Sequence, residues 1–161
     1  MNNNDIMRRV RYALDISNPR MVEIFKLVGC GMTEPTLLKL LKKEEEEEFI
    51  ECSNPLMTFF LDGLIINLRG RRESDDVQAA AGALPLNNNA ILKKLRIALN
   101  LKEDDMIAIM GLAGITISKS ELTALFRNSG HKHFKECGDQ FLRNFLKGVT
   151  LRNRPGVAVL S

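Results

Sequence analysis

The chain has no tryptophan, one tyrosine, two histidines and three cysteines among its 161 residues. Three cysteines cannot all pair with one another, and nothing in the sequence points to export, so we expect reduced thiols in a cytoplasmic protein. No apolar run approaches the roughly 20 residues that a membrane-spanning helix needs. The N-terminal residues contain no uninterrupted apolar segment, so no secretory signal is expected.

The overall composition is that of an ordinary globular protein, with 45% hydrophobic and 27% charged residues. This balance excludes wholesale disorder. The length suits one domain of usual size or two small ones. The net charge of +3 is small and does not by itself demand a nucleic-acid partner.

The sequence matches itself without a gap at an offset of 85 positions. Residues 1–71 share 20 identities with residues 86–156, where chance would give about four. MNNNDIMRRVRYALDI lies over LNNNAILKKLRIALNL, and FIECSNPLMTFFLDG lies over FKECGDQFLRNFLKG. We therefore predict two repeat units, residues 1–71 and 86–156, joined by a linker over residues 72–85 and followed by a tail over residues 157–161.

The apolar spacing is helical throughout each unit, and no segment alternates with period two. The spacing predicts an all-α protein made of two tandem four-helix units related by pseudo-symmetry, with no sheet. The first helix of each unit follows an Asn triplet that supplies N-cap candidates. Ser17 or Asn18 precedes the second helix and Thr33 precedes the third; the equivalent Ser118 begins a capping-box pattern with Glu121. The fourth helix begins near Pro55 or Asp139 and ends near Arg69 or Arg154.

Gly63 and Gly148 fall at equivalent positions inside the predicted fourth helices. A glycine in a helix interior costs about 1 kcal/mol relative to alanine. Its presence in both units predicts a close helix crossing that leaves no room for a Cβ atom.

Charge is distributed unequally between the two units. Residues 1–71 hold 10 Lys and Arg against 11 Asp and Glu, whereas residues 86–161 hold 12 against 6, a balance of −1 against +6. A basic face of the second unit could contact a nucleic-acid backbone or an acidic protein. The alternative is a solvated helix face whose long side chains cover the edge of the core. The candidate partner-binding residues are Arg8, Arg9, Arg11, Lys93, Lys94, Arg96, Arg127 and Arg154.

The second and third helices also have the apolar skeleton of a helix-turn-helix, which makes a DNA-binding regulator the main alternative function. The outward residues of the third helix would then include Lys39 in the first unit and Lys119 and Arg127 in the second. The predicted turn after Gly114 is longer than a helix-turn-helix normally has, and any helical hairpin shows the same skeleton.

His131, His133 and Cys137 form the nearest approach to a metal site or a Cys–His nucleophile. Zinc needs a fourth ligand that we cannot name, and the first unit has no histidine at these positions. We expect Cys137 and its counterpart Cys52 to be buried thiols at a helix entry, and Cys30 to be a core residue. The acidic run of residues 44–48 is expected to be a solvated surface loop.

No phosphate-binding glycine loop, nucleophile elbow, zinc-protease motif or paired CxxC is present. We therefore expect a non-enzymatic interaction module that uses no cofactor. Its partner would be a protein or a nucleic acid, and a Cys/His enzyme is the least favoured alternative.

The segments NNNAILKKLRIALNLKEDD (87–105) and HKHFKECGDQFLRNFLKG (131–148) resemble the YehS-like bacterial proteins. That family is built from two copies of a domain of unknown function. The resemblance extends from Asn2 to about Arg154. It implies a small bacterial cytoplasmic protein and assigns no catalytic or binding residues.

Overall fold

The computed structural model describes residues 1–71 and 86–156, so the predicted linker and tail lie outside the described residues. The chain divides into two compact units between Leu86 and Asn87. We call them unit 1 and unit 2 and describe each by itself.

Each unit contains four helices, and the described residues contain no strand. This confirms the predicted all-α class. The helices of unit 1 are α1 (Asn3–Leu14), α2 (Asn18–Lys26), α3 (Glu34–Leu40) and α4 (Asn54–Arg69); those of unit 2 are α6 (Asn88–Ala98), α7 (Glu103–Leu112), α8 (Lys119–Leu125) and α9 (Asp139–Asn153).

Polar side chains cap the helices where the sequence predicts them. The side chains of Asn2 and Asn87, the first residues of the two Asn triplets, cap α1 and α6, and Ser17 caps α2. The Ser118 hydroxyl accepts a hydrogen bond from the Glu121 N–H. A capping box also needs the Glu121 carboxylate to accept from the Ser118 backbone N–H, but here the carboxylate accepts from the Ser118 hydroxyl at 3.2 Å. The predicted capping box is therefore only half formed.

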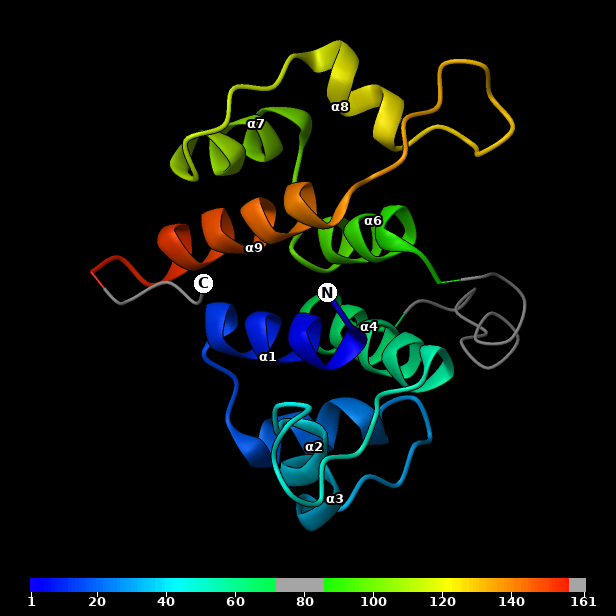
Figure 1. Ribbon diagram of the computed structural model, residues 1–161, viewed down its shortest axis with the longest axis vertical. Helices are drawn as coiled ribbons and strands as arrows, with labels where there is room; N and C mark the ends of the chain where they lie inside the picture. Colours follow the sequence, from blue (N-terminus) through cyan, green and yellow to red (C-terminus); the bar gives the residue numbers. More distant parts are fainter. Residues whose placement is uncertain (72–85, 157–161) are drawn as a thin grey trace. The chain divides into compact units, whose positions relative to one another are not determined.

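The second helix of each unit is central to its packing. Helix α2 packs against both α3 and α4, and α7 packs against both α8 and α9 (Figure 1). The first and fourth helices also pack on each other in both units. Phe25 of α2 and Phe60 of α4 are fully buried with their ring centroids 5.8 Å apart. The apolar faces predicted from helical spacing thus meet in a core within each unit.

The two interior glycines lie where the fourth helix crosses the second. A Cβ atom on Gly63 would be 2.1 Å from the backbone oxygen of Ile24, and one on Gly148 would be 2.2 Å from that of Ile109. Real Cβ atoms do not approach other atoms so closely, and a helix carbonyl cannot move without disturbing its own hydrogen bonds. The predicted close crossing is confirmed in both units.

Replacement of Gly148 by alanine should destabilise the protein by at least about 2 kcal/mol, because the added methyl group forces α9 away from α7. Gly111 in α7 provides a matched control, since a Cβ atom there meets nothing within 4 Å. Gly111→Ala should leave the free energy of unfolding unchanged or raise it by up to about 1 kcal/mol. Urea unfolding of both variants measures the difference, and equal effects would contradict the close crossing.

Candidate anion-binding site

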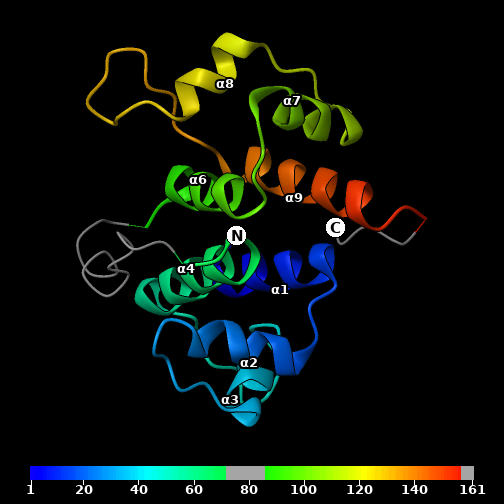
Figure 2. The same ribbon diagram turned by 180° about the vertical axis from the view of Figure 1, so that it is seen from behind.

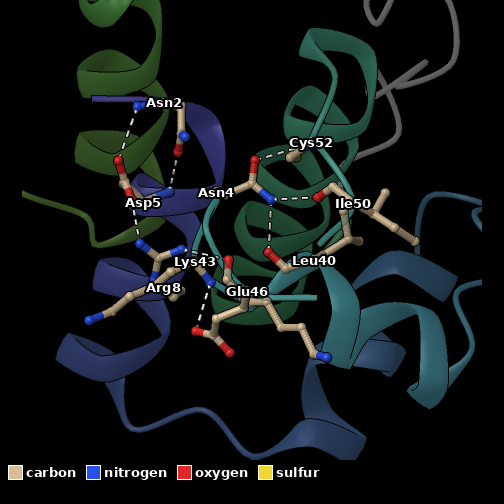
Figure 3. Close-up of polar contacts among 10 residues, drawn as sticks. Asn2, Asn4, Asp5, Arg8, Leu40, Lys43, Glu46, Ile50 and Cys52 are labelled. Carbon is tan, nitrogen blue, oxygen red and sulfur yellow. Dashed lines mark hydrogen bonds and ion pairs between the residues drawn. The ribbon is translucent and has the colours of Figure 1, made fainter. Parts of the chain in front are cut away.

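The third asparagine of each triplet connects the first helix to the long loop between the third and fourth helices. In unit 1 the fully buried Asn4 donates from Nδ2 to the backbone oxygens of Leu40 and Ile50, both at 2.8 Å (Figure 3). Its Oδ1 accepts from the Cys52 N–H at 2.9 Å. One amide therefore satisfies three backbone groups at both ends of the loop, which a buried backbone requires.

Unit 2 repeats this arrangement. Asn89 Nδ2 donates to the backbone oxygens of Leu125 and Lys135 at 2.9 Å, and Asn89 Oδ1 accepts from the Cys137 N–H at 2.8 Å. The preceding Asn88 donates to the Cys137 oxygen and to the Asp139 carboxylate at 2.7 Å. This last bond holds the pKa of Asp139 below its ordinary value. The sequence predicted the cap but not the roles of the second and third asparagines. Because a cap needs only one asparagine, the two further ones in each triplet were a signal that they have other roles.

One face of α6 is directed toward the end of α8. Asn89, Lys93 and Arg96 follow one another at spacings of four and three residues, which places them along one stripe of the helix. Asn89 bonds the Leu125 oxygen, and the Arg96 guanidinium carbon lies 4.6 Å from the centre of the Phe126 ring. The exposed Lys93 lies on this stripe between them, on the face of α6 that contacts the end of α8.

An open cavity of about 510 Å³ lies between α8 and the loop that follows it. Its lining residues are Ser120, Glu121, Ala124, Arg127, His133 and Lys135. The loop, yellow to orange in both views, extends away from the helices of unit 2 (Figures 1 and 2). Arg127 Nη1 donates to the His133 oxygen at 3.5 Å, which ties the loop to the end of α8. We call Lys93, Arg127, His133 and Lys135 the basic cluster.

The equivalent place in unit 1 is neutralised. Arg8, the counterpart of Lys93, forms an ion pair with Asp5 and donates to the Lys42 oxygen at 3.0 Å (Figure 3). Ala90 replaces Asp5 in unit 2, so Lys93 has lost the carboxylate partner. The counterparts of His133 and Lys135 are Glu48 and Ile50. Unit 1 thus keeps cations at Arg8 and at Lys42, the counterpart of Arg127, and has no basic residue at the other two positions of the cluster.

The structure divides the eight predicted partner-binding residues into three groups. Arg8, Arg11 and Arg96 bond within their own unit; Arg11 Nη2 donates to Asn18 Oδ1 at 2.6 Å, and Arg96 Nε donates to the Leu101 oxygen at 3.1 Å. Arg9, Lys94 and Arg154 are half-buried. Of the eight predicted residues, Arg127 lines the cavity, and Lys93 is exposed on the stripe of α6 that also carries Asn89 and Arg96. The matched basic positions are therefore largely structural, and only part of the predicted basic face forms a surface.

The cysteines do not have the environment of nucleophiles. Burial raises the pKa of Cys52 to about 12, and burial together with the nearby Asp139 charge raises that of Cys137 to about 11. The predicted buried thiols are confirmed for both residues. Cys30 is only half-buried, so its prediction as a core residue is wrong. Nor do His131, His133 and Cys137 form a metal site, because no group of three His, Cys, Asp or Glu within the described ranges is arranged to hold an ion.

The helix-turn-helix alternative gains no support from the geometry of unit 2. Residues 113–118 separate α7 from α8, whereas the motif uses a turn of three or four residues. Helix α8 has only seven residues, and Lys119 at its start lies 3.9 Å from Asp104. A helix this short offers few side chains to a DNA groove, and its first basic residue is paired with a carboxylate.

Comparisons with known proteins agree with the predicted resemblance. The model of a family described as a protein of unknown function, DUF1456, matches residues 3–70 and again residues 88–155. The uncharacterized protein YehS of Escherichia coli (strain K12) is 44% identical over 152 residues, which cover 94% of this chain and 96% of that protein. No solved structure matches. Among the described helices, none combines the length and the apolar character that crossing a membrane requires.

Replacement of Asn89 by alanine should lower the free energy of unfolding by about 3 kcal/mol, because it leaves two backbone oxygens and the Cys137 N–H without their partner. Urea unfolding measures the loss, and hydrogen exchange should show faster exchange of the Cys137 amide. Asn87→Ser is the control, since it keeps an N-cap acceptor and should change stability by less than about 0.5 kcal/mol. A neutral Asn89→Ala would contradict the role of this residue in holding the loop.

The folded protein should protect Cys52 and Cys137 from a maleimide at neutral pH, because both thiols are buried and protonated. Mass spectrometry should find Cys30 labelled first and the other two only after unfolding. Rapid labelling of Cys137 in the folded state would contradict this expectation and would favour the Cys/His enzyme.

Proposed function

This chain belongs to the DUF1456 family of proteins of unknown function, and we propose that it is a non-enzymatic binding module whose unit 2 contacts the phosphate backbone of nucleic acid through the basic cluster. The related YehS is itself described as uncharacterized, so the proposal rests on the chain's own residues. The observation that carries it is that Arg127 and Lys135 line one open cavity. Helix α6, whose Asn89 and Arg96 contact the residues at the end of α8, carries the exposed Lys93 on the same stripe.

These cations have no acidic partner within the described ranges. No ion pair involves Lys93, Arg127 or Lys135. Glu121 lines the same cavity and is charged, but it forms no ion pair with these cations; its carboxylate accepts a hydrogen bond from the Ser118 hydroxyl. Cations that lie together without carboxylate partners create a positive potential that attracts anions. A guanidinium can bind phosphate oxygens through paired hydrogen bonds, and the exposed Ser120 hydroxyl provides a further donor.

The composition of the cavity favours backbone contacts over base recognition. None of the six lining residues is aromatic, so the cavity offers no ring on which bases could stack. Contacts from Lys, Arg and Ser to phosphates position a nucleic acid without reading its sequence. We therefore propose binding without sequence preference, with the strong salt dependence of such complexes.

The protonated, buried thiols support a non-enzymatic role, and the three free cysteines support a location in the bacterial cytoplasm. We propose that no cofactor takes part, since contacts between cations and phosphates require none.

Fluorescence anisotropy with labelled single-stranded and double-stranded oligonucleotides tests the proposal. The wild-type protein should bind both with a dissociation constant of about 10⁻⁴–10⁻⁶ M. The double variant Lys93→Glu, Lys135→Glu should bind at least about tenfold more weakly, and the slope of log K against log salt should fall by about 2.

The matched control is Lys147→Glu, Arg152→Glu, which makes the same change of charge in unit 2 at two exposed positions of α9. Its salt slope should stay close to that of the wild type. Equal losses in the two double variants would mean that net charge alone drives binding and would contradict a local site. If oligonucleotides do not bind but an acidic protein depends on Lys93 and Lys135, the surface serves a protein partner and the nucleic-acid proposal is wrong.

A further inference from the structure

We propose that the acidic segment of unit 1, Glu44–Glu48, binds to the basic cluster of a second copy of the chain, so that copies associate head to tail. The proposal uses the surface assigned under the proposed function but does not require nucleic acid. It names an occupant of the basic cluster that the chain itself supplies.

In unit 1 the acidic segment occupies the place that residues 129–133, which include His133 of the basic cluster, occupy in unit 2. The offset of 85 residues places Glu44–Glu48 over residues 129–133, Ser-Gly-His-Lys-His. In both units this segment lies in the loop that Asn4 or Asn89 anchors through hydrogen bonds to its backbone. Unit 1 therefore presents five consecutive carboxylates where unit 2 presents one cation, Lys132, and no carboxylate. The five carboxylates are electrostatically complementary to the Lys and Arg side chains of the basic cluster.

The acidic segment is exposed but has a defined backbone. All five glutamates are exposed. Lys42 Nζ donates to the Glu47 backbone oxygen at 2.8 Å, and Glu46 Oε1 accepts from the Lys43 N–H at 3.1 Å. Within residues 1–71 and 86–156, the carboxylates of the other four glutamates have no hydrogen-bond or ion-pair partner. Five like charges in succession repel one another, and a cationic partner would relieve that repulsion.

Exposed apolar side chains accompany the acidic segment. Leu38 is 47% exposed and Ile50 is 37% exposed, and the Ile50 N–H donates to the Lys39 oxygen, which places Ile50 against the end of α3. Their counterparts in unit 2 are the polar Thr123 and Lys135. Burial of Leu38 and Ile50 against Ala124 and the aliphatic part of Lys135 would add an apolar contribution to the charge attraction.

The contact joins two different surfaces, so each copy retains one free acidic segment and one free basic cluster. Such a heterologous contact builds open chains or closed rings of copies. Ion pairs at an exposed surface stabilise weakly and are screened by salt. Association should therefore increase with protein concentration at low salt and disappear at high salt.

Sedimentation velocity of the full chain over a range of concentrations, at about 0.05 M and about 0.5 M salt, tests the proposal. The wild type should sediment faster as concentration rises at low salt only. Two variants should remain monomeric: the neutralised segment with each of Glu44 to Glu48 replaced by Gln, and Lys93→Glu, Lys135→Glu. Lys147→Glu, Arg152→Glu is the matched control and should associate like the wild type.

A mixture of the two monomeric variants gives the sharpest test. The Gln variant keeps the basic cluster, and the Lys93→Glu, Lys135→Glu variant keeps the acidic segment. One contact can then form between them and no second one, so an equimolar mixture should produce a heterodimer and nothing larger. Circular dichroism and urea unfolding of each variant show that loss of association does not come from loss of the fold.

Three results would overturn the proposal: a wild-type monomer at every concentration at low salt, undiminished association of the Gln variant, or no heterodimer in the mixture. The outcome is separable from the proposed function, because the Gln variant retains the basic cluster. Oligonucleotide binding by that variant, with or without self-association in the wild type, distinguishes failure of this inference from failure of the nucleic-acid proposal.

Discussion

Each unit depends on one asparagine amide that satisfies backbone groups on both ends of a long loop. The third and fourth helices of a unit are separated by a loop with little regular structure. A buried residue lies near each end of it: Leu40 and Cys52 in unit 1, Leu125 and Cys137 in unit 2. Buried backbone groups without partners would cost more than a small core can offset. Asn4 and Asn89 remove this cost with three hydrogen bonds each. The loop can therefore be long and irregular without weakening the packing around it.

Anchored ends leave the middle of the loop free to change. The asparagine bonds involve only backbone atoms of the loop, so they place no demand on the side chains between Leu40 and Ile50 or between Leu125 and Lys135. The same loop frame consequently carries five glutamates in unit 1 and a histidine- and lysine-containing segment in unit 2. Opposite charges on one frame explain how a chain with a net charge of +3 contains a slightly acidic and a strongly basic half.

The fold was largely predictable from the sequence, whereas the site was predictable only in part. Helical spacing, caps and the paired glycines at positions 63 and 148 are local or periodic signals, and the structure follows them. The cavity is lined both by α8 and by the loop residues His133 and Lys135, the first of which lies eight positions after that helix ends. No periodic pattern in the sequence predicts that these residues lie close together. The matched charges were misleading, because Arg8 and Arg96 each donate to a backbone oxygen of their own unit. A sequence cannot distinguish such a cation from one that faces a partner.

In this tandem repeat, identity between the two units marks residues that the fold requires and not residues that bind a partner. Positions kept in both units, such as the asparagines, the crossing glycines and the buried cysteines, satisfy requirements of the shared fold. Function is better sought where the units differ, because the fold tolerates the difference. Lys93 illustrates this: its counterpart Arg8 is paired with Asp5, and Ala90 in place of that carboxylate leaves the exposed Lys93 without this ion pair. The acidic segment Glu44–Glu48 of unit 1 is a second difference of this kind, since the equivalent residues 129–133 of unit 2 contain no carboxylate.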